Sequence, residues 1–229
     1  MPAMAIYNPV HTQIDLGREF AARPRDMIYV GRLVSQKGVP VLLDAMAKLK
    51  HRGIAVSTTI VGDGSDRQAL EAQARDAGID EQVRFTGRVD LARVNALLGE
   101  HRMMIVPSVY REPFPMAVLE GLAAGCLLIA SHTGGLPEGV GPCGMTFPMR
   151  DSGALADRIE EALANPAMAA AFRKAIPAHL DTLRQDRIVD RYLEAFERFL
   201  RHRVGERMTI RRAARLTIAE MTEGAGIAR

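Results

Sequence analysis

The stretch from Met27 to Lys50, MIYVGRLVSQKGVPVLLDAMAKLK, contains the unit from which the fold is predicted. Its first five residues form a short apolar run that is typical of a buried strand. From Val39 onward, apolar residues recur every three or four positions, which indicates one buried face of a helix. The residues from Gly31 to Gly38 form a short loop between the two. A strand, a loop and a helix in this order predict one βα unit.

The same alternation continues along the chain. We expect further strands at 55–62, 82–87, 102–108, 126–131 and 144–148, and helices at 70–77, 91–98, 116–124 and 152–163. Because right-handed crossovers place the helices on both faces of a parallel sheet, the pattern predicts an α/β fold, a Rossmann-like three-layer sandwich.

Only helical patterns follow Asn165, at 168–175 and 186–200. The second of these carries an apolar stripe, Ile188, Tyr192, Phe196 and Phe199. We therefore predict a linker segment at 1–26, one domain at 27–200 that includes C-terminal helices, and a basic tail at 201–229 that is helical or disordered.

Composition excludes several classes of protein. The net charge of +3 over 229 residues is too small to imply a nucleic-acid partner. Two cysteines are too few for a disulfide framework, and Cys126 lies in an apolar run where a buried free thiol is expected. The longest apolar run, 122–130, is much shorter than the ~20 residues that cross a bilayer. With no signal-like N-terminus, we expect a cytoplasmic protein.

Positive charge is concentrated near the C-terminus. Only Glu206 opposes a run of seven arginines there: Arg198, Arg201, Arg203, Arg207, Arg211, Arg212 and Arg215. Such a run is typical of a solvated helix face, and it also suits a partner domain or peripheral attachment to an anionic inner membrane face.

The loops that follow parallel strands meet at one edge of the sheet, so chemistry is sought there. The loop 31–38 combines Gly31, which lets the backbone approach a ligand, with the cations Arg32 and Lys37. It leads into a helix whose first amides are unpaired. These features predict an anion site suited to a diphosphate.

A second loop, 108–120, places Glu112 and Glu120 eight residues apart. Pro115 fits the first turn of a helix, which puts Glu112 before the helix and Glu120 inside it. In one interpretation Glu112 faces a sugar or a developing positive charge, and Glu120 binds a ribose diol. In the other, Glu112 caps the helix and Glu120 points to water. The spacing alone does not establish the separation that a glycosidase acid/base pair requires.

Three smaller features are interpreted more conservatively. Gly134 and Gly135 form a flexible pair at a helix start and could contact phosphate or sugar. The DGSD segment at 63–66 could suggest a metal site, but helix capping by Ser65 or Asp66 explains it, and no metal is expected. His132 is interpreted as a polar loop residue, and His101 as a core or strand-edge residue.

Taken in order, six segments resemble the C-terminal, donor-binding domain of the GT-B glycosyltransferases, specifically the retaining family 4. The resemblance covers 8–200 and rests on NPV (8–10), VGRLVSQKG (30–38), IVGDG (60–64), VRFTGRV (83–89), VPSVYREPFPMAVLEGLAAG (106–125) and IASHTGGLPEGV (129–140). It implies transfer of a sugar from a nucleotide sugar, such as a UDP-, GDP- or ADP-sugar, with retention and without a metal or other cofactor.

The resemblance also implies roles for individual residues. Arg32 and Lys37 would clamp the donor diphosphate and, with a helix dipole, stabilise the leaving group. Glu112 would lie against the sugar and Glu120 would hold the ribose. The backbone after Glu112, at Phe114, Pro115 and Met116, would lie against the donor sugar, where the family's amides bind sugar hydroxyls. The remaining donor-binding residues would be Gly31 and Gly62, Arg88 and Val89 beside the base, and Gly134 and Gly135.

The sequence departs from the family pattern in two places. Pro115 stands where the family commonly has glycine, which removes one amide from the sugar site. The N-terminal domain that carries the acceptor site is missing, so we expect a fragment or a separate partner chain. The helix 186–200 resembles the element that crosses back toward that domain. Two alternatives stay open, a non-catalytic interaction module and a GT-B sugar-nucleotide epimerase.

Overall fold

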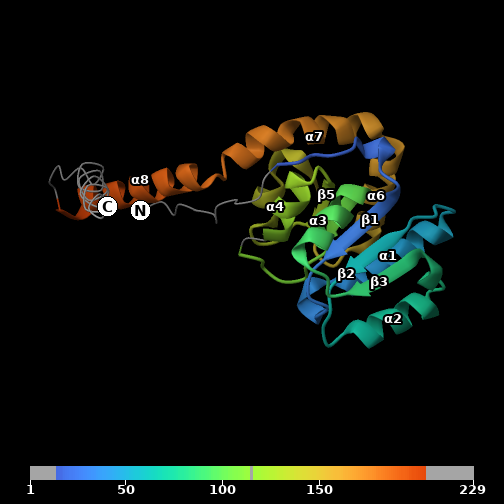
Figure 1. Ribbon diagram of the computed structural model, residues 1–229. Helices are drawn as coiled ribbons and strands as arrows, with labels where there is room; N and C mark the ends of the chain where they lie inside the picture. The colour runs from blue at the N-terminus through green and yellow to red at the C-terminus, as the bar shows by residue number, and fades with distance from the viewer. Residues whose placement is uncertain (1–13, 114–115, 205–229) are drawn as a thin grey trace, which may run out of the picture. The chain divides into compact units, whose positions relative to one another are not determined.

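The computed structural model describes residues 14–113 and 116–204. Residues 14–181 belong to one compact unit, and residues from Thr182 onward belong to a second. The first unit contains the sheet and the helices around it (Figure 1). Each unit is described by itself below.

The first unit is built on a parallel sheet of six strands. The strand order is β3-β2-β1-β4-β5-β6, and each neighbouring pair is parallel. Their bounds are β1 Arg25–Val30, β2 Thr58–Val61, β3 Val83–Gly87, β4 His101–Val106, β5 Leu127–Ser131 and β6 Gly144–Phe147. The predicted parallel α/β fold is confirmed.

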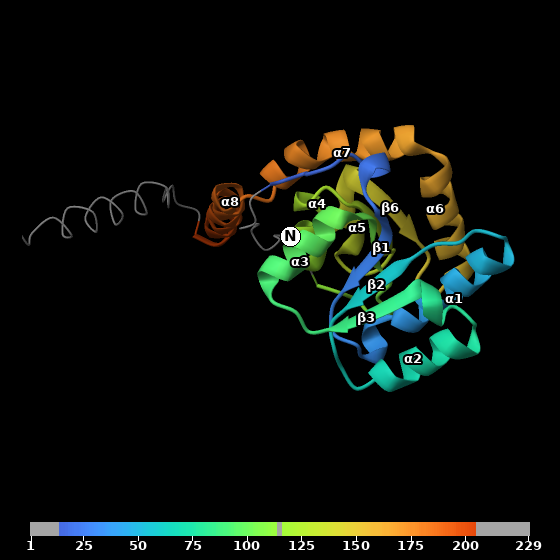
Figure 2. The same cartoon turned by 45° about the vertical axis from the view of Figure 1, so that its right-hand side comes forward.

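Helices cover both faces of this sheet (Figures 1 and 2). They are α1 Val39–His51, α2 Arg67–Asp76, α3 Leu91–Glu100, α4 Met116–Ala123, α5 Leu136–Val140, α6 Ser152–Ala164 and α7 Pro166–Asp181. Four short 3-10 helices join them: η1 Phe20–Ala22, η2 Ser35–Lys37, η3 Asp80–Gln82 and η4 Gly141–Cys143.

Alternate residues of the central strands point to opposite faces and form two buried layers. Met27 of β1 and Met103 of β4 pack in one core with Leu42 and Met46 of α1 and with α6. On the other face, Met104 of β4 lies against α4, where its sulfur occupies the space beside Gly121. Both layers are almost fully shielded from water, as the continuous apolar strands of a parallel sheet require.

The first strand begins two residues before the predicted start of the domain, because β1 begins at Arg25 inside the predicted linker. The preceding residues are also part of the unit. Arg23 is buried, and its guanidinium donates hydrogen bonds to the carbonyls of Leu98, His101, Leu16 and Ala124. A charged residue read as linker is therefore an anchor, because its five N–H groups find backbone acceptors in place of water.

The C-terminal limit also differs from the predicted one. Helix α7 is longer than the predicted 168–175, and the sheet-bearing unit ends at Asp181 rather than at 200. Helix α8, Gln185–Val204, belongs to the second unit. Of its predicted apolar stripe, Ile188 is buried, Tyr192 and Phe196 are exposed, and Phe199 is outside the described side chains.

Several predictions about the ends of the chain lie outside the described residues. These are the NPV segment, the place of Pro115 in a helical first turn, and most of the arginine-rich tail, which α8 enters as far as Val204. Among the helices that the structure describes, none is both long and apolar enough to cross a membrane. Cys126 and Cys143 are buried free thiols, as expected for Cys126.

The strand order fixes where a ligand site can form. The chain builds β1, β2 and β3 outward in one direction and then returns to place β4 on the other side of β1. The loops after β1 and β4 therefore leave the sheet in opposite directions from neighbouring strands. In open α/β sheets, this switch point at the carboxyl ends of the strands is where ligands bind.

Candidate functional site

The loops after β1 and β4 are held against one another at the switch point. The amide of Val109 donates a hydrogen bond to the carbonyl of Gln36, with an N–O distance of 2.9 Å. Gly38 has a φ of 70°, and a side chain there would overlap the carbonyl of Pro107. The glycine is therefore required both by its left-handed backbone and by the closeness of the second loop. The result is that Lys37 lies beside the 108–112 segment.

Four side chains form a hydrogen-bonded group at this point, which we call the Lys37–Glu112 cluster. Lys37 Nζ lies 2.6 Å from Glu112 Oε1 and 3.4 Å from the hydroxyl of Tyr110. Ser108 donates to Glu112 Oε1 at 2.7 Å, and Tyr110 donates to Glu112 Oε2 at 2.9 Å. Lys37 Nζ is also 5.2 Å from the centre of the Tyr110 ring, within cation–π distance.

The cluster holds Glu112 in its charged form. Glu112 is only 5% exposed, and such burial by itself would raise the pKa of its carboxyl. The hydrogen bonds from Lys37, Ser108 and Tyr110, together with the charge of Lys37, outweigh burial and lower that pKa below its ordinary value. At neutral pH the site therefore contains a buried carboxylate that neutralises Lys37.

Tyr29 of β1 contacts the loop that carries Arg32 and Lys37. Its hydroxyl donates to the carbonyl of Arg32 at 2.9 Å. Burial, with the negative charge of Glu112 as a second cause, raises the pKa of Tyr29, so the phenol stays protonated as a donor. Tyr29 thereby fixes the backbone of the loop that carries Arg32.

Two arginines at the same edge of the sheet are exposed. Arg32 follows β1, and Arg88 follows β3. Within the described residues, neither guanidinium makes a hydrogen bond or an ion pair. The strand ends that carry them are linked, since Gly31 donates to the carbonyl of Val61, and Gly62 donates to that of Gly87. Val89 is half-buried next to Arg88. Arg32 is the cation nearest in sequence to Lys37 that is available to an anion.

Glu120 lies in α4 and is not part of the Lys37–Glu112 cluster. Its carboxyl is half-buried, and burial raises its pKa. The Glu120 carboxyl makes no hydrogen bond or ion pair with any residue that the structure describes. The alternative in which Glu112 caps a helix stays a prediction, because residues 114–115, which lead into α4, are outside the described residues. In the described part of the chain, both Glu112 oxygens bond to the other three members of the cluster.

Gly134 and Gly135 support the backbone of Glu112. Gly134 has a φ of 56°, and a side chain there would overlap the main chain of Glu112. A side chain at Gly135 would overlap the carbonyl of Pro113. The amide of Gly135 donates to the carbonyl of Glu112 at 2.7 Å and is therefore already used. The pair brings the loop after β5 into contact with the loop after β4.

Other predicted residues fall in more ordinary surroundings. Met116 is the first residue of α4, and Phe114 and Pro115 are outside the described residues. Asp66 is at the N-cap of α2 but its side chain does not cap the helix, because its Oδ1 accepts a hydrogen bond from Ser65. That part of the capping prediction is wrong.

The two histidines behave as interpreted. His101 is a core residue, with Nδ1 2.6 Å from the carbonyl of Leu97 and Nε2 2.9 Å from the hydroxyl of Thr59. His132 is an exposed residue just after β5, with Nδ1 3.1 Å from the hydroxyl of Thr146.

Sequence reasoning missed three members of the site: Tyr29, Ser108 and Tyr110. The signal for two of them was present, because Ser108 and Tyr110 place hydroxyl groups four and two residues before Glu112. Tyr29 lies in the apolar run that predicts the first strand, and that pattern gives no sign of the role of its hydroxyl.

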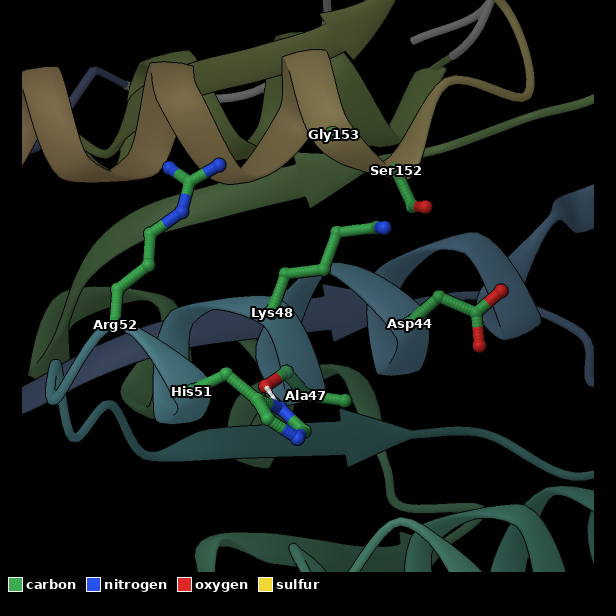
Figure 3. A pocket seen from close by; sticks show the side chains of 7 residues that line it. All are labelled: Asp44, Ala47, Lys48, His51, Arg52, Ser152 and Gly153. Atoms are coloured by element: carbon green, nitrogen blue, oxygen red, sulfur yellow. Dashed lines mark hydrogen bonds between the residues drawn. The ribbon is translucent and has the colours of Figure 1, made fainter.

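Two surface hollows lie away from the Lys37–Glu112 cluster. One, of about 660 Å³, is lined by α1 residues and by the start of α6 (Figure 3). There Lys48 extends toward Ser152, while Arg52 pairs with Asp157 and Glu160. The other, of about 420 Å³, is lined by His132 and the residues around the end of β6. Neither contains a member of the cluster, so the site is assigned from its chemistry and position, not from the size of a hollow.

The fold and the cluster define a class of protein. A parallel sheet with a cation, a carboxylate and an exposed arginine at its switch point has the arrangement of an α/β domain that binds a phosphate-bearing ligand. The particular family is given by direct comparison. Residues 16–179 match the family model for glycosyl transferases group 1, and the chain belongs to this family.

Related proteins agree with this assignment. A glycogen synthase from Mycobacterium tuberculosis is 36% identical over 176 residues, which are 73% of this chain and 42% of that protein. The putative colanic acid biosynthesis glycosyltransferase WcaL from Escherichia coli is 30% identical over 60% of this chain and 36% of its own length. The chain thus spans less than half the length of these curated relatives.

Solved structures show the same fold. Sucrose-phosphate synthase from Thermosynechococcus elongatus matches with a TM-score of 0.65 and 27% identity, over 79% of this chain and 46% of that one. Anabaena HepE in complex with UDP matches with a TM-score of 0.67 and 20% identity, over 80% of this chain and 56% of that one. The sheet-bearing unit therefore has the Rossmann-like fold found in GT-B glycosyltransferases.

Proposed function

We propose that this chain is the donor-binding part of a retaining glycosyltransferase that transfers a sugar from a nucleoside diphosphate sugar. The observation that carries the proposal is the Lys37–Glu112 cluster at the switch point of the sheet, with the exposed Arg32 on the same loop as Lys37. Lys37 and Arg32 supply the cations for a diphosphate, and Glu112 supplies a buried carboxylate for the sugar. Family membership and the UDP named with HepE support a nucleotide sugar as the ligand.

The cations suit the leaving group of this reaction. Breaking the bond between the sugar and the diphosphate leaves additional negative charge on the phosphate oxygens. Arg32 can offer two parallel N–H groups, Lys37 offers an ammonium, and α1 begins two residues after Lys37 at the same edge of the sheet. These groups stabilise the leaving diphosphate without a bound metal ion.

Glu112 and Glu120 have different surroundings and take different roles. Glu112, charged and buried, faces developing positive charge at the reacting sugar carbon or accepts hydrogen bonds from its hydroxyl groups. Glu120, half-buried with a raised pKa and without a partner in the described chain, accepts the ribose hydroxyls. Arg88 and Val89 follow β3 and border the base. The acceptor is bound by another domain, in the same or a separate chain.

Calorimetric titration of the purified chain with UDP, GDP and ADP tests the proposal. One of the three is expected to bind with a dissociation constant below about 1 mM, which corresponds to about −4 kcal/mol. Absence of binding by all three would contradict it. Release of free sugar from the matching nucleotide sugar would show catalysis and exclude a non-catalytic module, and the product of UDP-N-acetylglucosamine would reveal an epimerase.

The role of Glu120 is tested by Glu120→Gln in the same titration. Loss of a charged acceptor for the ribose diol is expected to weaken nucleotide binding by roughly 1–3 kcal/mol. The free base, which lacks ribose, serves as the control ligand and should bind the variant and the original chain equally. Equal nucleotide affinity in both proteins would remove Glu120 from the site.

A further inference from the structure

The lysine assigned to the donor diphosphate is paired with a carboxylate of the same chain. Lys37 Nζ lies 2.6 Å from Glu112 Oε1, and the side chains of the two residues are only 20% and 7% exposed. An ammonium has three N–H groups, and two of them are directed to the Glu112 carboxylate and the Tyr110 hydroxyl. While Lys37 keeps this partner, the carboxylate offsets the charge that it presents to a phosphate.

We propose that Glu112 competes with the donor diphosphate for Lys37, and that donor binding exchanges one anion for the other. This inference rests on the proposed function, because it takes the diphosphate as the incoming anion. No covalent bond changes in the exchange. Lys37 moves its ammonium from a carboxylate oxygen to a phosphate oxygen, and Glu112 becomes available to the sugar.

The arrangement of the cluster explains how Glu112 can lose Lys37 and keep its position. Ser108 donates to one carboxylate oxygen and Tyr110 to the other. Neither bond depends on the ammonium. The main chain of Glu112 is also held, by the amide of Gly135. Ser108 and Tyr110 are therefore positioning residues that hold the carboxylate in place during the exchange.

The charges around the cluster favour an exchange over simple addition of the ligand. Lys37 from η2 is the only cation that the structure describes in contact with the Glu112 carboxylate. Arg32, on the same loop, is exposed and unpaired within the described residues. A diphosphate held by Arg32 would bring a second, more highly charged anion to Lys37, and like charges would then separate Glu112 from it.

Affinity measurements distinguish exchange from a second model, in which Glu112 orients Lys37 toward the phosphate. The two models predict opposite changes in UDP affinity when the charge of Glu112 is removed. Glu112→Gln keeps the shape and an acceptor oxygen but removes the competing charge. If Glu112 competes, UDP binds this variant more tightly, roughly tenfold for an effect of 1.4 kcal/mol. Unchanged or weaker binding of UDP by the variant would overturn the exchange.

A matched control removes an ion pair of equal length far from the site. Arg158 Nη1 and Glu161 Oε2 lie 2.6 Å apart on the exposed surface of α6. Glu161→Gln is expected to leave UDP affinity unchanged. Uridine, which lacks phosphate, should bind Glu112→Gln and the original chain equally, because the competition concerns the diphosphate alone.

The structure of the unaltered chain with UDP gives a second measurement that does not depend on a variant folding. We expect Lys37 Nζ within hydrogen-bond distance of a phosphate oxygen and no longer bonded to Glu112, with Ser108 and Tyr110 still on the carboxylate. A complex that retains the Lys37–Glu112 bond would overturn the exchange and leave the proposed function standing. If UDP, GDP and ADP all fail to bind the original chain, both proposals are wrong.

Discussion

At the scale of single residues, Glu112 shows how neighbours can reverse the effect of burial. Burial alone disfavours a charged carboxyl, and Glu120 has the raised pKa that follows when nothing compensates. Glu112 is more buried, yet its pKa is lowered, because three donors bond to its two oxygens. The two glutamates of one motif therefore differ in proton affinity through their surroundings.

The lowered pKa of Glu112 predicts that the stability of the folded chain depends on pH in the acidic range. Because the folded-state pKa of Glu112 is below its ordinary value of 4.5, the stability that its charge contributes is fully present above pH 4.5. It is lost as the pH falls through the lower folded-state pKa. The stability advantage of the original chain over Glu112→Gln should therefore shrink below pH 4.5 in thermal unfolding.

The control for this experiment is again Glu161→Gln. Its ion pair is close to half-exposed, so removing it should change stability little at any pH. A difference between the original chain and Glu112→Gln that stays constant from neutral to acidic pH would show that the Glu112 charge does not stabilise the fold.

The sequence predicted Lys37 and Glu112 as site residues but not as partners. They are 75 residues apart, and each was assigned to a different part of the ligand. Their pairing depends on how closely two loops approach, which no local pattern encodes. Ser108 and Tyr110 are close to Glu112 in the sequence, but that spacing does not show that their hydroxyls turn toward its carboxylate.

At the scale of elements, the loop after β1 depends on Gly38. This residue combines a left-handed backbone, with φ 70°, and direct contact with the carbonyl of Pro107. Gly53, just after α1, has a similar φ of 77° but open space around it. Substitutions at the two glycines can therefore distinguish the effect of backbone strain on stability from the effect of steric overlap.

Substitution of each glycine by alanine makes use of this contrast. Gly53→Ala should lose only the strain energy, of order 1–3 kcal/mol, and keep its affinity for nucleotide. Gly38→Ala should lose more stability, because the new Cβ forces the loops after β1 and β4 apart, and should bind nucleotide more weakly. Chemical denaturation and calorimetry measure both effects. Equal affinity in the two variants would show that the loop contact is not needed for binding.

The types of the elements were predicted better than their ends. All six strands are present, but β2 begins at Thr58, later than the predicted residue 55. Helix α7 continues through Pro177 to Asp181. A proline inside a helix is locally unfavourable, and α7 tolerates it because the helix packs against η1, η4 and α4. Such tertiary support is invisible in a local pattern.

At the scale of the whole molecule, the site lies entirely within one unit. Every residue assigned to it falls between Tyr29 and Gly135, inside the sheet-bearing unit that ends at Asp181. That unit has its own buried core on both faces of the sheet. The limits of the unit were harder to predict than its fold, because the burial of Arg23 depends on backbone carbonyls distant in the sequence.

Truncation tests the independence of this unit. A chain that ends before Gln185 lacks α8 and the arginine-rich tail, and it keeps every residue of the site. It should bind UDP, or whichever nucleotide the full chain binds, with the same dissociation constant. A large loss of affinity in a truncated chain that still unfolds cooperatively would show that the second unit contributes to the site.

The position of the Lys37–Glu112 cluster also matters for how the sheet holds together. Lys37 follows the first strand, in the half of the sheet formed by β1, β2 and β3, while Glu112 belongs to the half formed by β4, β5 and β6. Partial unfolding of either half would break the cluster. A ligand that contacts residues of both halves would therefore oppose their separation. Its binding would require both halves of the sheet to be folded, so ligand affinity would measure folding of the whole sheet.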